Sequence, residues 1–119
     1  MKVVSIASGS KGNAYLVEHA GEAVLIDCGV CLKKLKGIEF SAVLVTHSHS
    51  DHVSGLKALL KHRDVPVFAN AMTAEATACE FGVPEDAFVC FENGQSFDVG
   101  PFAVSPFSIP HDKIGRAHV

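Results

Sequence analysis

The sequence predicts a mixed α/β (α+β) domain built on a mixed sheet. Three strand-length apolar segments follow one another near the N-terminus with only short turns between them, which is typical of antiparallel strands. From residue 41 onward, strand-like and helix-like segments alternate, which indicates a mixed sheet with helices on its outer face. With 119 residues, 48% of them hydrophobic, the chain is one small domain or part of a larger one, with enough apolar surface for a core.

The first three strands are predicted at residues 2–7, 14–19 and 23–27. The turn at residues 8–13 contains two glycines, which favour turn conformations, and a second turn spans residues 20–22. The third strand is almost continuously apolar, so we expect it to be buried, and it ends at Asp27. A short helix is then predicted at residues 30–36, followed by a strand at residues 41–46.

In the second half of the chain, segments with the apolar spacing of a helix alternate with segments typical of a strand. Apolar residues at helical spacing predict a helix at residues 53–63, and a strand follows at residues 65–69. A second helix is predicted at residues 73–81, ended by Gly82. The last strands are predicted at residues 87–91, 96–99 and 102–109. An Asn-Gly turn joins the first two of these strands, and Pro106 indicates that the last is an edge or interrupted strand.

Three histidines and one aspartate directly follow the strand at residues 41–46, namely His47, His49, Asp51 and His52. Alternate residues of a strand share a face, so we expect His47 and His49 to point toward one place, with Asp51 and His52 on the following turn. Neutral imidazoles and carboxylates are ligands of zinc and similar divalent ions. A solvated loop that binds metal adventitiously is the alternative. The order of strand, histidine cluster and helix favours a site for two metal ions.

Residues 46–52 (THSHSDH) resemble the signature of the metallo-β-lactamase fold superfamily of metal-dependent hydrolases. Upstream, residues 7–13 (ASGSKGN) are similar to its YycJ/WalJ-like branch, and so are residues 109–112 (IPHD) downstream. That branch is linked to nucleic-acid phosphodiesterases. The resemblance covers residues 1–113 and implies that they form the N-terminal half of an αββα sandwich.

The resemblance implies a centre for two divalent ions, either zinc or manganese. It assigns one ion to His47, His49 and His111, and it begins the second site with Asp51 and His52. Asp51 is also implied to be catalytic, because it would orient or deprotonate the nucleophile. A bridging aspartate and a final histidine are implied further along the chain, so we expect this chain to be truncated.

For Asp27 and His111, a role outside the metal centre is an alternative interpretation. Asp27 stands at a strand tip, and the resemblance implies that it supports the metal ligands from outside the ligand set. A ligating histidine usually donates its other ring N–H to such an oxygen acceptor. The alternative role for Asp27 is to cap the next segment. For His111, the alternative to metal binding is a loop histidine that precedes Asp112.

The loop at residues 8–13 has two interpretations. It is either an ordinary hairpin turn or a substrate-binding loop, in which Ser8, Ser10 and Asn13 donate hydrogen bonds and Lys11 attracts phosphate. The glycine spacing does not match a Walker loop, and a strand rather than a helix is predicted to follow. We therefore do not expect nucleotide binding of the P-loop kind.

The net charge of −3 disfavours indiscriminate binding to nucleic acid. The lysine-rich segment at residues 33–36 is either a solvated face or a contact for a phosphodiester backbone. Neither a transmembrane segment nor a signal peptide is evident, so we expect a cytoplasmic protein, and no protein partner is evident. We expect free, reduced thiols at Cys28, Cys31, Cys79 and Cys90, the last two buried as small apolar residues.

The chemistry implied is metal-assisted hydrolysis. The leading prediction is a di-metal phosphodiesterase or nuclease acting on nucleic acid. A thioester or lactam hydrolase of the same fold and an inactive metal-binding fragment are the alternatives, because a fold alone does not choose a substrate. Residues 114–119 show no strand or helix pattern and resemble one reading frame of a sequencing-library adapter. We predict that they are a non-native tail.

Overall fold

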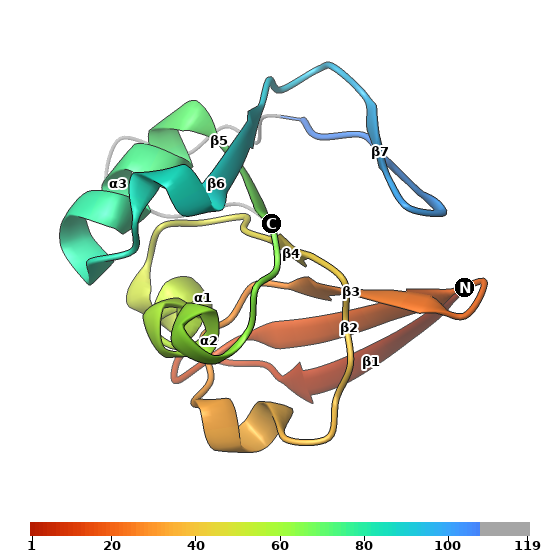
Figure 1. Cartoon of the computed structure of the whole chain (residues 1–119), viewed down its shortest axis with the longest axis horizontal. Coiled ribbons are helices and arrows are strands. Elements are labelled where there is room, and N and C mark those ends of the chain that lie inside the picture. The colour runs from red at the N-terminus through yellow and green to blue at the C-terminus, as the bar shows by residue number, and fades with distance from the viewer. Residues whose placement is uncertain (108–119) are drawn as a thin grey trace.

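The computed structural model of the chain describes residues 1–107, which form a six-stranded sheet and a separate two-stranded hairpin (Figure 1). The strands are β1 (Lys2–Ala7), β2 (Ala14–His19), β3 (Glu22–Ile26), β4 (Val43–Leu44), β5 (Val67–Asn70), β6 (Phe88–Phe91), β7 (Phe97–Val99) and β8 (Phe102–Val104). The helices are α1 (Ser50–Val53), α2 (Leu56–His62) and α3 (Ala71–Phe81), with 3₁₀ turns η1 (Leu32–Leu35) and η2 (Glu85–Ala87). The predictions for His111 and for residues 114–119 lie outside the described residues.

The strands of the large sheet follow chain order from β1 to β6. The first three pair antiparallel, and the pairs β3–β4, β4–β5 and β5–β6 are parallel. The predicted antiparallel meander and the mixed sheet are therefore confirmed. The carboxyl ends of the parallel strands β3 and β4 lie at the same edge of the sheet.

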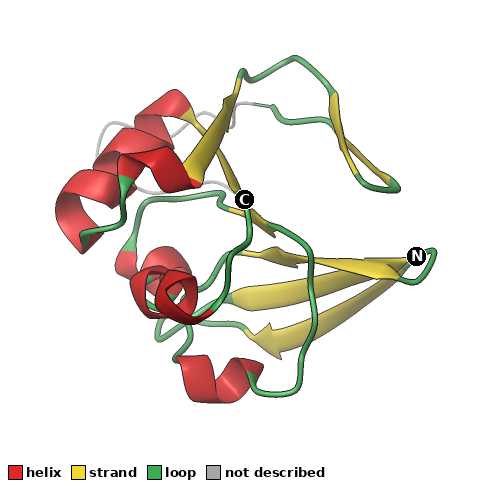
Figure 2. Ribbon diagram, in the orientation of Figure 1, coloured by secondary structure: helices red, strands yellow, loops and turns green. Residues whose placement is uncertain are grey.

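Successive side chains of a strand point to opposite faces of the sheet, so alternate residues pack into one of two apolar clusters, one on each face. Val43 and Val67 belong to the larger core, which also contains side chains from α1, α2 and α3. Leu44 and Phe68, the next residues on the same strands, pack with the β7–β8 hairpin in a second cluster. In Figure 2 the helices gather on the left, and the hairpin extends to the upper right. Helices cover one face of the sheet, as the predicted fold class requires.

Two predicted strands are longer than the observed ones. The strand predicted at residues 41–46 pairs only over Val43–Leu44, after which the chain leaves the sheet and carries the histidine cluster into a loop. Of the strand predicted at residues 102–109, the part up to residue 107 is described, and in that part only Phe102–Val104 pair. Pro106 lies just beyond this strand, and its ring nitrogen has no hydrogen to donate to a ladder.

The prediction of one continuous helix at residues 53–63 is wrong, because α1 and α2 are separate. The break falls at Gly55, whose N–H donates to the carbonyl oxygen of Cys28 (2.9 Å) rather than to a carbonyl within α1. The helix predicted at residues 30–36 is reduced to the short turn η1. At Gly55, a tertiary contact with the segment that follows β3 therefore overrides the helical pattern.

Helix α3 begins two residues before its predicted start, and its cap explains the difference. The side chain of Asn70 accepts a hydrogen bond from the backbone N–H of Thr73 (2.8 Å), which satisfies one free donor of the first turn. Gly82 ends the helix as predicted, in a left-handed conformation (φ 68°) that glycine adopts without steric cost.

Arg63 fixes the connection that precedes β4. Its guanidinium donates to the carbonyl oxygens of Ile38 (2.7 Å) and Leu35 (3.0 Å), and it lies 4.6 Å from the ring centroid of Phe40. These contacts tie the end of α2 to the β3–β4 crossover. They hold in place the strand that delivers the histidine cluster.

The four thiols are unpaired, but only Cys28 is buried. The expectation that Cys79 and Cys90 are buried is wrong. Helix α3 turns Ala74 and Thr77 toward the core and leaves Cys79 outward, and Cys90 lies on β6 at the edge of the sheet. Among the described residues, no helix is long and apolar enough to cross a membrane.

Cys28 is expected to resist thiol reagents in the folded chain, because burial raises its pKa from 9.0 to about 11 and keeps the reactive thiolate scarce. Labelling near pH 8 should modify Cys31, Cys79 and Cys90 quickly and Cys28 only after unfolding in urea. Because the unfolded thiol loses its proton first, stability should also fall as the pH rises from about 9 toward 11. Fast labelling of Cys28 in the folded chain would contradict its burial.

Candidate metal centre

The candidate centre lies where β3 and β4 end. Asp27 directly follows β3, and the segment from Thr46 to His49 follows β4. Asp51 and His52 lie in α1, so the prediction that they sit on a turn is wrong. Because β3 and β4 are parallel, their carboxyl ends bring Asp27 and the histidine segment to one edge of the sheet.

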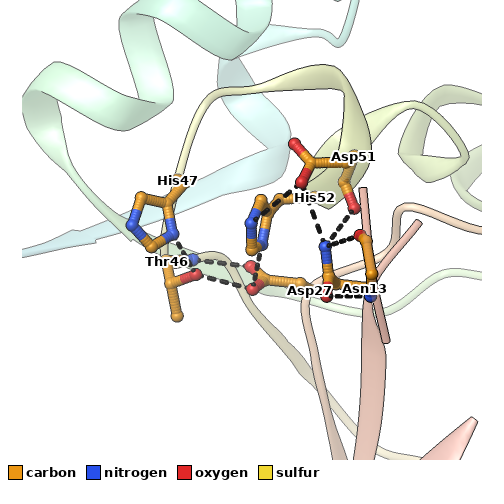
Figure 3. A network of polar contacts seen from close by, with 7 residues as sticks. Asn13, Asp27, Thr46, His47, Asp51 and His52 are labelled. Carbon is orange, nitrogen blue, oxygen red and sulfur yellow. Dashed lines mark hydrogen bonds and ion pairs between the residues drawn. The ribbon is translucent and has the colours of Figure 1, made fainter. Parts of the chain in front are cut away.

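Asp27 is the buried acceptor at the middle of the centre, with only 3% of its surface exposed. Its Oδ1 accepts the backbone N–H of Thr46 (2.7 Å), and its Oδ2 accepts the Thr46 hydroxyl (2.6 Å). The same Oδ2 lies 2.7 Å from Nδ1 of His52 (Figure 3). Asp27 adopts a left-handed backbone conformation (φ 63°), in which aspartate is better tolerated than most residues. One carboxylate thus organises both flanking segments.

His47 and His52 lie side by side, with ring centroids 4.6 Å apart. Asp27, His47 and His52 each present one potential ligand atom, and these atoms all lie within 4.8 Å of one another. The ring of His49 stacks beside His47 at a centroid distance of 6.0 Å, and His49 is exposed. Of the predicted cluster, the structure thus brings His47 and His52 together with Asp27, whereas His49 lies outside this group.

A second pair of candidate ligands forms within α1. Oδ2 of Asp51 lies 3.6 Å from Nε2 of His52, so the two atoms face each other across a short gap. The side-chain amide of Asn13 donates to the same Asp51 Oδ2 (3.1 Å) and to the Asp51 carbonyl oxygen (3.2 Å). In Figure 3, Asn13 lies beside Asp51 on the opposite side from Thr46 and His47.

The environment of His52 favours its protonated form. Hydrogen bonding to Asp27 is the largest effect that raises the pKa of His52, and it outweighs burial, which acts in the opposite direction. The charges of Asp27 and Asp51 raise it further. A metal ion at Nε2 would therefore compete with a proton, which makes affinity depend on pH.

Backbone hydrogen bonds lock three segments of the centre together. Asn13 donates its N–H to the carbonyl oxygen of Asp51 (2.7 Å), and Gly29 donates to that of Asn13 (2.9 Å). Cys28 donates to the carbonyl oxygen of His52 (2.7 Å). A Cβ atom at Gly29 would overlap the Asp51 carbonyl, so this close approach requires glycine.

A family profile described as the metallo-beta-lactamase superfamily matches residues 7–112. The chain belongs to this superfamily. The resemblance predicted from the histidine signature is thereby confirmed, and the described residues form part of a metallo-beta-lactamase domain.

Two exodeoxyribonucleases of bacteria are similar to this chain. Exodeoxyribonuclease YycJ of Bacillus anthracis is 34% identical over 117 residues, a match that covers 90% of this chain and 44% of that protein. Exodeoxyribonuclease WalJ of Streptococcus pneumoniae is 29% identical over 121 residues and matches 92% of this chain and 45% of that protein. The chain thus spans less than half the length of these relatives.

Solved structures show the same fold. A B3 metallo-beta-lactamase with an active-site glutamic acid superposes with a TM-score of 0.69 at 20% identity, covering 95% of this chain and 51% of that chain. At this identity the likeness concerns the fold alone. It agrees with the predicted class, a mixed α/β arrangement that makes up part of a metallo-beta-lactamase sandwich.

The candidate centre contains two further residues that were not predicted from the sequence as site residues, Thr46 and Gly29. Thr46 bridges Asp27 and His47, since its hydroxyl also lies 2.8 Å from Nδ1 of His47. Gly29 permits the close approach of the Asp51 backbone. Thr46 adjoins the histidine cluster in the sequence, so its hydroxyl was a visible signal. For Gly29, nothing in the local sequence indicated the contact.

The predicted substrate loop lies against the centre through one residue. Asn13 exchanges hydrogen bonds with Gly9 (Gly9 N–H to Oδ1, 3.1 Å; Nδ2 to the Gly9 carbonyl, 2.9 Å) and also reaches Asp51. Ser8, Ser10 and Lys11 are exposed on this loop. Their predicted contacts with substrate, and that of Asn13, remain predictions.

The side chains gathered at the candidate centre fit a divalent ion. Imidazole nitrogens and carboxylate oxygens converge at one edge of the sheet, and the buried Asp27 contacts Nδ1 of His52, the kind of contact that ligating histidines make through their second ring nitrogen. Asp51 and His52 present a carboxylate oxygen and a ring nitrogen to each other, as two ligands of a shared ion do.

Proposed function

We propose that this chain supplies the ligand-bearing part of a metal-dependent phosphodiesterase that acts on nucleic acid. The observation that carries the proposal is the close approach of the His47 and His52 rings at one sheet edge, with centroids 4.6 Å apart. Oδ2 of Asp51 faces Nε2 of His52, and Asp27 contacts Nδ1 of the same ring from outside the proposed ligand set. The superfamily supports a metallo-hydrolase. The names of the two relatives, both exodeoxyribonucleases, support a nucleic-acid substrate.

Each residue has a distinct part in this proposal. His47, His49 and His111 would hold one ion, and Asp51 and His52 would begin the site of a second, the ions being zinc or manganese. When bound, such ions act as Lewis acids and lower the pKa of a bound water, so that hydroxide is available as the nucleophile near neutral pH. The Asp51 carboxylate orients the attacking water and accepts its proton, while Asn13 holds that carboxylate in place.

The remaining residues position the ligands and the substrate. Asp27 fixes the His52 ring from outside the ligand set through the hydrogen bond at Nδ1. Ser8, Ser10 and Lys11 are exposed on the loop that Asn13 ties to Asp51, where they would meet a phosphodiester backbone. A substrate bound there would lie next to the Asp51 carboxylate.

The test is hydrolysis by the complete product of the reading frame that contains this sequence. With manganese or zinc supplied, we expect cleavage of DNA or RNA, abolished in the His47→Ala variant. Cleavage of a lactam or a thioester alone would reject the phosphodiesterase in favour of another hydrolase of the same fold. Stoichiometric metal binding without hydrolysis of any of the four substrates would favour a metal-binding protein without activity.

A further inference from the structure

A chain of short hydrogen bonds runs from Asp27 to both neighbouring histidines. Oδ2 of Asp27 lies 2.6 Å from the Thr46 hydroxyl and 2.7 Å from Nδ1 of His52. The Thr46 hydroxyl lies 2.8 Å from Nδ1 of His47. His52 therefore meets the carboxylate directly, and His47 meets it through the hydroxyl of Thr46 (Figure 3).

The number of available protons decides the direction of each bond. An ionised carboxylate only accepts hydrogen bonds, and a threonine hydroxyl has a single proton to donate. The 2.6 Å distance is that of a charge-assisted O–H···O⁻ bond, so the Thr46 proton lies on the Asp27 side. The hydroxyl can then only accept from His47, which places the imidazole hydrogen on Nδ1. The same rule places a hydrogen on Nδ1 of His52.

We propose that Thr46 is a positioning residue. Its hydroxyl connects the Asp27 carboxylate to His47 through two hydrogen bonds, and this relay fixes the His47 tautomer. With the hydrogen on Nδ1, Nε2 of His47 carries the lone pair that a metal ion requires. His52 obtains the same tautomer without a relay. The relevance of this tautomer to metal binding rests on the proposed function, whereas the tautomer itself depends only on the hydrogen bonds.

The geometry of the site explains why a hydroxyl group is needed between the Asp27 carboxylate and the His47 ring. His47 does not share the direct contact that His52 makes with Asp27, and the Thr46 hydroxyl bridges the intervening distance. The backbone N–H of Thr46 is bonded to Oδ1 of Asp27, which holds the hydroxyl close to Oδ2. A serine at position 46 retains the relay, and a valine of nearly the same shape removes it.

Thr46→Val and Thr46→Ser form a matched pair for the test, because residue 46 is exposed and neither change disturbs a core. Ring nitrogen shifts in the metal-free chain, recorded by NMR above the titration range of the imidazoles, report the tautomer of each histidine. Competition titration with zinc reports the affinity. Circular dichroism verifies that each variant is folded.

We expect the wild type and Thr46→Ser to hold His47 with its hydrogen on Nδ1. In Thr46→Val that preference should be lost at His47 and kept at His52, and zinc affinity should fall about 10- to 100-fold. An unchanged His47 tautomer in Thr46→Val would overturn the relay. A changed tautomer with unchanged affinity would overturn the positioning role.

The two proposals fail in different ways. If the wild type shows the expected tautomers but binds neither zinc nor manganese, the proposed function is rejected and the relay stands. If metal binds tightly in every variant, the metal centre stands and the role of Thr46 is rejected.

Discussion

Replacing Asp27 with asparagine is expected to weaken metal binding about 10- to 100-fold and to destabilise the chain by about 1–3 kcal/mol. Both oxygens of Asp27 accept hydrogen bonds, Oδ1 from the Thr46 backbone and Oδ2 from Thr46 and His52. An amide has only one acceptor oxygen. Either orientation of the asparagine therefore places an N–H group against existing donors, or forces the hydroxyl and the imidazole to reverse their roles.

Zinc titration and urea unfolding of the metal-free chain measure the two effects of Asp27→Asn separately. Asp64→Asn is the matched control, because it removes the same charge at an exposed position. The control should leave both quantities near their wild-type values. Wild-type affinity and stability in Asp27→Asn would show that the buried carboxylate organises neither histidine.

Replacing Gly29 with alanine is expected to disrupt the centre more broadly, by forcing apart the backbone segments that carry Asp51 and Asn13. The added Cβ would overlap the Asp51 carbonyl oxygen and crowd the Asn13 nitrogen. Overpacking of this kind costs about 1–3 kcal/mol or more, and backbone cannot move aside as a side chain can. We expect a lower urea midpoint together with loss of tight metal binding.

Gly37→Ala is the control for Gly29→Ala. Gly37 has a left-handed backbone (φ 78°) but open space around its Cβ position, so alanine there carries a conformational cost of about 1–2 kcal/mol and no clash. We expect it to lower stability while metal affinity is retained. Equal metal affinities in the two variants would argue against a special role for the close approach at Gly29.

Much of the fold was predictable because it depends on local patterns. The bounds of β1 and β2 agree with the prediction, and Gly82 ends α3 as expected. The separation of α1 from α2 was not predictable, because the apolar spacing continues through the break. What interrupts the helix is the contact of Gly55 with the carbonyl oxygen of Cys28, which is distant in the sequence.

In the candidate site, too, local sequence patterns were predictable and tertiary contacts were not. His47, His49, Asp51 and His52 could be proposed as ligands because a single short segment contains them all, and the structure brings His47 and His52 together with Asp27. Their hydrogen-bond partners come from elsewhere: Asp27 lies 19 residues before Thr46, and Asn13 lies 38 residues before Asp51. Asp51 and His52 were predicted to lie on a turn after the strand at residues 41–46, whereas the structure places them in α1, which begins at Ser50. Donor identity is thus readable from the sequence, but donor orientation depends on the fold.

We predict that the segment from the end of β4 to the start of α1 forms a metal centre. The most direct test is the metal content of the chain after equilibration with zinc or manganese and exhaustive dialysis, measured by elemental analysis. We predict stoichiometric metal in the wild type and its loss in the His47→Ala, His49→Ala double variant. A folded double variant with the same metal content as the wild type would contradict the assignment.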